Sequence, residues 1–235
     1  MKAAIKRKIN EVVQQAVTSA GHLGLKRQRQ GYWTARRDEV QWEVETLYEE
    51  AYGEGVFRVG WGVLAPGLAE IVDRVESEGI YDATVGGDVG SLATRSRRMV
   101  MLCVPGATMG HLNRWLWKAK PEPEEVLAAR IAGWLSGPVT SVFQSMTTRR
   151  EIVDFLENHE ARYGKVFMHP EDREQELALI AGLRALDGDI EGALTAVDAW
   201  RSMLRPGSDS YGVLSAKVDR IAGRIRRLPR GNTSR

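Results

Sequence analysis

The first twenty residues carry apolar side chains at intervals of three and four, the spacing that places residues on one face of an α-helix. The apolar positions are Ile5, Ile9, Val12, Val13, Ala16 and Val17. This pattern predicts an amphipathic helix over residues 3–20. Gly21 is well placed to end it, because glycine favours helix C-termini.

After a basic stretch the hydrophobic period changes from helical spacing to strict alternation. The alternating β-branched and aromatic positions are Val40, Trp42, Val44, Thr46 and Tyr48. Since successive residues of a strand point to opposite faces, the pattern predicts a half-buried strand with Glu43 and Glu45 on its solvated face. Residues 31–49 then form a hairpin of two antiparallel strands. Alternation over residues 57–63, ended by Pro66, predicts a third strand.

The rest of the chain separates strands from helices. Residues 68–78 fit a helix, and residues 80–90 and 98–104 fit a fourth and a fifth strand. From Thr108 onward the pattern is helical. The expected helical segments are 111–119, 121–135, 147–164, 169–204 and 212–228, the fourth divided into two helices at Gly188–Asp189.

These elements predict an α+β fold: an N-terminal helix and an antiparallel sheet of about five strands, followed by a C-terminal set of helices packed on it. We divide the chain into a helix-and-sheet domain over 1–120, a helical region over 121–228 and a disordered tail over 229–235. The "PEPE" segment at the boundary is too short for a flexible linker. Because strands and helices do not alternate, a doubly wound nucleotide-binding fold is excluded.

Charge is arranged in blocks, although the net charge is only +2. Residues 1–37 hold nine Lys/Arg and one acid, residues 38–90 hold thirteen Asp/Glu and two arginines, and residues 91–120 hold six basic residues and no acid. Six arginines and no acid follow Asp219. Such blocks either pair with one another across the fold or face different partners, and the sequence leaves both interpretations open.

The cysteine count and the apolar segments of the chain indicate the cellular compartment. The single cysteine, Cys103, excludes an intrachain disulfide framework, and the N-terminus lacks the apolar segment of a secretory signal. No stretch approaches the apolar length of a membrane span. We therefore expect a cytoplasmic protein.

The stretch "DATVGGDVGSLATRSRRMVM", residues 82–101, combines glycines with arginines as phosphate-binding loops do. It has no lysine for a Walker loop, "GGDVGS" misses the G-x-G-x-x-G spacing, and Asp88 would repel a phosphate. We interpret it as a strand–loop–strand connection. Cys103 lies in an apolar run typical of a core position, and the four histidines lack metal-ligand spacing. We assign no catalytic residue, no metal site and no cofactor.

Several short motifs follow one another in a recognisable order. The predicted N-terminal helix leads into "GLKRQRQGYW", and then come "VQWEVETLY", "FRVGWGVLAP", "VGGDVGSL" and "NRWLWKA". This order resembles a bacterial family known only as domain of unknown function 4304. In the resemblance, Gly24, Leu25 and Lys26 stand at a Gly-Phe-Lys-Lys-like motif, Trp42 at a strand tryptophan, and Gly62–Val63 at a strand end.

The chain departs from the family pattern at two positions. Asp88 stands where an arginine is common, and Glu45 stands where a glutamine is expected. The resemblance implies the α+β fold and brings no established activity. Some members of the family look like accessory or immunity-type proteins of bacterial conflict systems, which is an association and not a mechanism.

Our leading hypothesis is a non-catalytic, cytoplasmic bacterial module that binds another protein. Its narrowest form is an immunity or accessory protein of a conflict system. An acidic sheet face suits a cationic protein partner, because complementary potentials favour encounter. The residues expected to contact the partner are Glu43, Glu45, Glu49 and Glu50.

Two alternatives come from other functional classes. One is a nucleic-acid-binding protein that uses its basic ends, with phosphate contacts from a C-terminal cluster. That cluster consists of Arg220, Arg224, Arg226 and Arg227. The other alternative is an enzyme with a pocket between the sheet and the helices, in which Glu43 or Glu45 works with Arg97 or Arg98.

Overall fold

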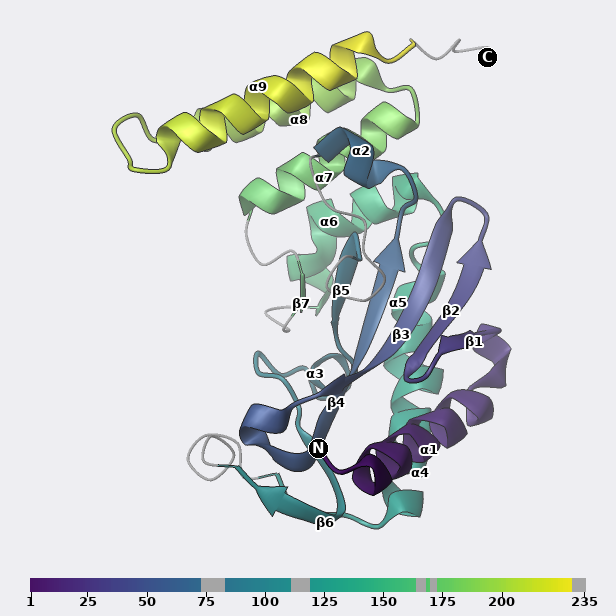
Figure 1. The fold of residues 1–235 in the computed structure, drawn as a ribbon. Helices are drawn as coiled ribbons and strands as arrows, with labels where there is room; N and C mark the ends of the chain where they lie inside the picture. Colours follow the sequence, from purple (N-terminus) through teal and green to yellow (C-terminus); the bar gives the residue numbers. More distant parts are fainter. Residues whose placement is uncertain (73–82, 111–118, 164–167, 170–172, 230–235) are drawn as a thin grey trace.

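A computed structural model describes residues 1–72, 83–110, 119–163, 168–169 and 173–229 of the chain (Figure 1). The first half contains α1 (Ala3–Ser19), η1 (Gly21–Leu23), β1 (Lys26–Arg29), β2 (Tyr32–Arg37), β3 (Val40–Tyr48), η2 (Glu50–Tyr52), β4 (Gly53–Leu64), α2 (Leu68–Val72), β5 (Val85–Asp88), α3 (Val89–Thr94) and β6 (Leu102–Met109). The second half contains α4 (Glu124–Trp134), η5 (Leu135–Val139), α5 (Thr140–Gln144), α6 (Arg149–Tyr163), β7 (Met168–His169), α7 (Arg173–Leu186), α8 (Ile190–Met203) and α9 (Tyr211–Arg227).

The strands form one antiparallel sheet. They lie in the order β1-β2-β3-β4-β5-β7, and β6 pairs with the first part of β4. β2 and β3 form the predicted hairpin, with Arg37 opposite Val40 across a two-residue loop. The α+β prediction is confirmed, and so are the predicted strands over residues 31–49 and 57–63. β1 and β7 were not predicted.

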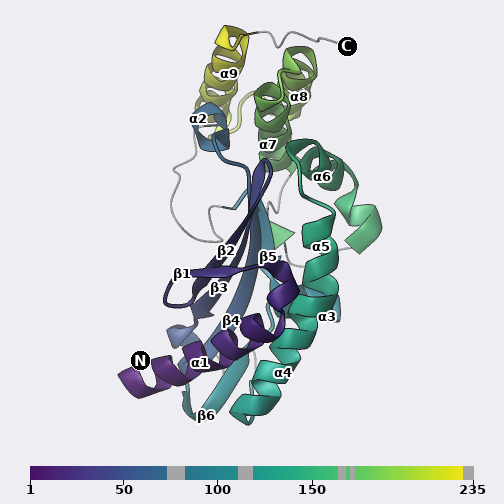
Figure 2. The same ribbon diagram turned by 90° about the vertical axis from the view of Figure 1, so that its right-hand side faces the viewer.

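One face of the sheet is apolar and is covered by helices. Trp42 of β3 stacks on Phe143 of α5 with ring centroids 5.0 Å apart, and Trp61 of β4 meets the same ring edge-on at 6.3 Å. The indole nitrogen of Trp42 donates a hydrogen bond to the carbonyl of Met146 (3.1 Å). Figure 2 shows α4 and α5 running along this face. One cluster of buried hydrophobic residues includes the apolar sheet face, α1 and the helices beyond residue 121.

The helix over the sheet is continuous from α4 to α5. Its backbone widens to π geometry in η5, where Pro138 has no N–H for the regular ladder. Residues Glu124–Gln144 are the one helix in the described part of the chain that is long and apolar enough to cross a membrane. Ile131, Leu135 and Phe143 of this helix are buried, so in this structure its apolar side chains form part of the core.

The C-terminal helices pack at one end of the sheet, and Figure 1 shows α8 and α9 lying side by side beyond it. Gly182 of α7 allows a close approach to α2, because a Cβ there would lie 2.4 Å from Leu68 Cδ1. The predicted break between α7 and α8 is confirmed. Gly188 has a positive φ of 80°, and the Asp189 side chain caps α8 by accepting from the Gly192 N–H (2.9 Å).

The glycine-rich stretch differs from its predicted strand–loop–strand form. β5 leads directly into α3, a helix of six residues, before the chain enters β6. The hydrophobic pattern did not predict this helix, because six residues are too few to show a helical period. The predictions for residues 73–78 and 111–118 lie outside the described residues, and so does all but the first residue of the predicted tail.

Candidate functional site

Glu43 occupies the polar face of the sheet, as predicted, but it is buried. Its side chain accepts hydrogen bonds from the Tyr32 hydroxyl (2.7 Å) and from Gln41 Nε2 (2.8 Å), and the residue is 1% exposed. The prediction of a solvated acidic face is therefore wrong at Glu43. Alternation assigned the side chain to the correct face, whereas the burial of that face depends on residues distant in sequence.

The other three predicted acidic contacts take part in ion pairs within the chain. Glu45 pairs with Arg29 (3.1 Å) and Glu49 pairs with the buried Arg58 (2.6 Å). Glu50 lies 3.3 Å from the N-terminal amine of Met1 and is exposed. These acids therefore do not form a continuous exposed acidic surface. Internal pairing, one of the two interpretations of the charge blocks, accounts for them.

Asp88, in the middle of the glycine-rich stretch, is fully buried and holds the turn into α3. Its Oδ1 accepts hydrogen bonds from the Ser91 N–H (2.6 Å), the Ser91 hydroxyl (2.8 Å) and the Val100 N–H (3.0 Å). Burial raises the pKa of this carboxyl, and the hydrogen bonds and the charge of Arg58 oppose that rise. Within the described residues its Oδ2 has no hydrogen-bond partner. Asp88 acts as a structural cap in a stretch that turns the chain.

The enzyme hypothesis needs Glu43 or Glu45 on the helix-covered side of the sheet, and the structure contradicts this. Both residues alternate with Trp42 and Val44, which face the helices, so both lie on the opposite face. Arg97 and Arg98 are exposed in the loop after α3. The described part of the chain does not bring these four residues together between the sheet and the helices.

The predicted basic cluster of α9 is divided between different surroundings. Arg224 Nη1 donates hydrogen bonds to the carbonyls of Glu70 (3.0 Å) and Ile71 (3.4 Å), so this arginine fastens α9 to α2. Arg226 and Arg227 are exposed. The arginines at 220, 224 and 227 therefore do not serve as one free phosphate-binding row, and nucleic-acid binding stays a prediction.

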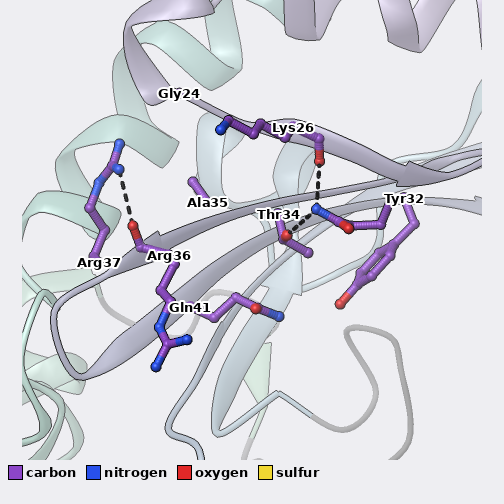
Figure 3. Close-up of a pocket in the computed structure, with 9 residues that line it drawn as sticks. Gly24, Lys26, Tyr32, Thr34, Ala35, Arg36, Arg37 and Gln41 are labelled. Atoms are coloured by element: carbon purple, nitrogen blue, oxygen red, sulfur yellow. Dashed lines mark hydrogen bonds between the residues drawn. The ribbon is translucent and has the colours of Figure 1, made fainter.

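A groove of about 480 Å³ lies along the β1–β2 hairpin, and we call it the hairpin groove (Figure 3). Its lining residues are Gly24, Lys26, Gln28, Tyr32, Thr34, Ala35, Arg36, Arg37 and Gln41. Such a volume lies within the range of ligand pockets, but the lining is polar where small-molecule pockets are mostly apolar. The groove is therefore suited to a charged or polar segment.

Among the described residues, the lining of the hairpin groove contains three cations and no carboxylate. Lys26 and Arg36 are exposed and Arg37 is half-buried. Within the described residues none of the three forms an ion pair. The sequence contains no acid between Glu11 and Asp38, so local neighbours do not neutralise this charge. The charged side chains of the lining are thus all positive, and the buried carboxylate of Glu43 lies behind it, bonded to Tyr32 and Gln41.

Arg37 is held in position by three contacts. Its Nη2 donates to the Leu23 carbonyl (2.7 Å) and its Nη1 to the Arg36 carbonyl (3.2 Å), while its guanidinium lies over the Trp42 ring at 4.5 Å. The two carbonyls take one N–H of Nη1 and one of Nη2, so an anion would have to bind the remaining N–H groups of this guanidinium. Gly24, with a positive φ of 63°, lies against this group, since a Cβ there would be 3.1 Å from Nη2.

A second concavity, of about 390 Å³, lies beside α6. Of its polar residues, Glu151 accepts from the N–H groups of Thr147 and Thr148 at the start of the helix (2.8 and 3.0 Å). His159 Nε2 lies 3.5 Å from Glu176. These contacts are those of a capped helix, and in the described part of the chain no cluster of His, Cys, Asp and Glu has the form of a metal site.

Cys103 is buried, as predicted for a core cysteine, and burial raises the pKa of its thiol. A thiol with a raised pKa is mostly protonated and is a weak nucleophile.

The hairpin groove was missed by the sequence interpretation. Residues 26–29 were assigned to a basic loop because they contain no apolar alternation, although the basic block itself was noted.

Comparison of the chain with protein-family models, with curated proteins and with solved structures found no match. The resemblance to a domain of unknown function therefore stays a prediction.

Proposed function

We propose that this chain is a non-catalytic binding protein that takes an acidic segment of a partner protein into the hairpin groove. The proposal keeps the protein-binding hypothesis and reverses the charge of the partner. Its narrowest form is a cytoplasmic immunity or accessory protein of a bacterial conflict system, as the family resemblance implies.

One observation carries the proposal. Lys26, Arg36 and Arg37 line a single groove whose described lining residues include no carboxylate, whereas Glu45 and Glu49 are neutralised within the chain. Positive potential concentrated in a groove raises both the encounter rate and the affinity for an anionic partner.

The lining favours an acidic peptide over single-stranded nucleic acid. Sequence-tolerant binding of single strands uses exposed aromatic faces on which bases stack. The one aromatic lining residue, Tyr32, is 3% exposed and its hydroxyl is bonded to Glu43. Arg37 covers the nearby ring of Trp42. Carboxylates, in contrast, need only the cations that the groove presents.

The test is a fluorescence anisotropy titration with fluorescein-labelled hexaglutamate. We expect saturable binding that weakens as salt rises from about 50 mM to about 500 mM, because salt screens exposed charges. The double variant Lys26→Gln/Arg36→Gln removes two exposed cations and should weaken binding roughly fivefold.

The matched control is Arg226→Gln/Arg227→Gln, which removes the same charge from α9. It should leave hexaglutamate binding unchanged if the groove is the site. Equal losses in both double variants would show non-specific attraction and would contradict the proposal. Tight binding of a thymidine oligonucleotide that only the α9 variant abolishes would favour the nucleic-acid alternative.

A further inference from the structure

The outer edge of β2 is only partly covered by β1. The ladder between them begins with Lys26 opposite Thr34 and ends with Arg29 opposite Tyr32. β2 continues for three more residues, Ala35–Arg37, which pair with β3 on their other side. In the described part of the chain no strand pairs with the outer edge of these three residues.

One residue of this segment turns its backbone to the open edge. Residues of an antiparallel strand direct their N–H and C=O groups alternately to the two neighbouring strands. The Thr46 N–H donates to the Gly31 carbonyl, and the register from there is unbroken, so Ala35 and Arg37 also turn their groups to β3. Arg36 is therefore the one residue of the three that turns its N–H and C=O to the open edge. The carbonyl of Arg36 already accepts a hydrogen bond from the side chain of Arg37 (3.2 Å), which a backbone N–H of an added strand would have to displace.

One end of the hairpin groove lies beside this open edge, and the rest covers the polar face of β1, β2 and β3. It runs from Gly24 and Lys26, where β1 begins, past Ala35 and Arg36 (Figure 3). Gly24 ends η1 in the left-handed conformation, and β1 begins only two residues later, at Lys26. The space thus continues the line of β1 for about 10 Å beside three strand residues.

We propose that the partner segment binds as an added β-strand, in line with β1 and paired with Ala35–Arg37. This inference rests on the proposed function and specifies how the acidic segment is held. Main-chain hydrogen bonds to β2 supply affinity, and side-chain charges supply specificity, as in other cases of strand addition. Arg36 and Arg37 project to opposite faces of the sheet, so successive carboxylates of an extended segment each meet a cation (Figure 3).

The charge of the edge selects an acidic chain over a second copy of this protein. β1 presents Lys26, Arg27 and Arg29 on four residues that are all exposed. Edge-to-edge pairing of two copies would place these cations against one another, which is how natural sheets avoid self-association. The same positive charges attract an acidic extended segment.

The experiment compares hexaglutamate with a hexaglutamate analogue whose backbone amides are replaced by esters. The analogue keeps all carboxylates but lacks the N–H donors that pair with β2. We expect it to bind about tenfold more weakly, the effect of losing one or two net hydrogen bonds. Hydrogen exchange of the Arg36 amide should also slow in the presence of hexaglutamate and remain fast with the ester analogue.

The outcomes separate this inference from the function on which it rests. Equal affinity of the two ligands, with no change in exchange at the Arg36 amide, would overturn strand addition and leave an electrostatic binding groove. Absence of binding by both ligands would overturn the proposed function as well. The control variant Arg226→Gln/Arg227→Gln should bind the ester analogue more weakly than hexaglutamate, as the unmodified protein does. That result supports strand addition at the hairpin.

Discussion

Phe143 offers the sharpest test of how the helices join the sheet, because one ring contacts both core tryptophans. It is fully buried on α5, stacked on Trp42 at 5.0 Å and edge-on to Trp61 at 6.3 Å. We consider its replacement by alanine. The change removes the whole ring from a position where the rigid sheet cannot move in to fill the space.

The expected loss is about 4 kcal/mol, from the roughly 3–5 kcal/mol measured for buried Phe→Ala changes. About 1 kcal/mol of this is the specific aromatic pairing. A chain of this size loses roughly 2–4 °C in Tm for each kcal/mol, so Tm should fall by about 10 °C.

The assay is urea unfolding followed by tryptophan fluorescence and, separately, by far-ultraviolet circular dichroism. Phe143→Leu keeps most of the volume and should lose about 1.5 kcal/mol or less. Ser141→Ala, an exposed change on the same helix, should lie within about 0.5 kcal/mol of the parent. A loss below about 1 kcal/mol for Phe143→Ala would refute the packing of α5 on Trp42 and Trp61.

Three further predictions concern buried or capped groups. Asp88→Asn keeps the Oδ1 acceptor and removes a carboxyl whose folded pKa is raised by burial. The unmodified protein should therefore lose stability as pH rises above 3.8, the ordinary pKa of the carboxyl, whereas the variant should not. Urea unfolding across a range of pH measures the difference. The pKa of Glu151 is shifted in the opposite direction, because hydrogen bonds from Thr147 lower it. Its contribution to folding stability is therefore present at neutral pH and is lost as pH falls below 4.5, the ordinary pKa of the carboxyl. Glu151→Ala should therefore cost about 1 kcal/mol at pH 7 and less in acid, in the same assay. The buried Cys103 should resist a thiol reagent in the native protein and react fully in denaturant; rapid native labelling would contradict its placement in the core.

The strands β2, β3 and β4 could be predicted because one of their faces is apolar and the alternation records it. The strand β1 could not, since an edge strand whose side chains are all exposed leaves no hydrophobic pattern. The helix α3 was missed for a different reason. It depends on a cap by Asp88 and on a hydrogen bond from Val100, twelve residues away, neither of which a periodicity detects.

The candidate site also depends partly on local sequence and partly on contacts between residues distant in sequence. The basic block of residues 1–37 was visible in the sequence, but the groove exists because β1 begins opposite Thr34 and leaves Ala35–Arg37 uncovered. Register of this kind is set by long-range pairing. Likewise, the charge blocks did not show which arginine Glu45 and Glu49 would each contact, so internal pairing and partner binding both stayed open.

The most direct test is to locate the binding site on the protein by amide NMR during a titration with hexaglutamate. We predict that the largest shifts fall between Gly24 and Gln41, with those of residues 35–37 among them, and that α9 is unaffected. Shifts confined to Arg220–Arg227, or spread evenly over all exposed cations, would contradict binding in the hairpin groove.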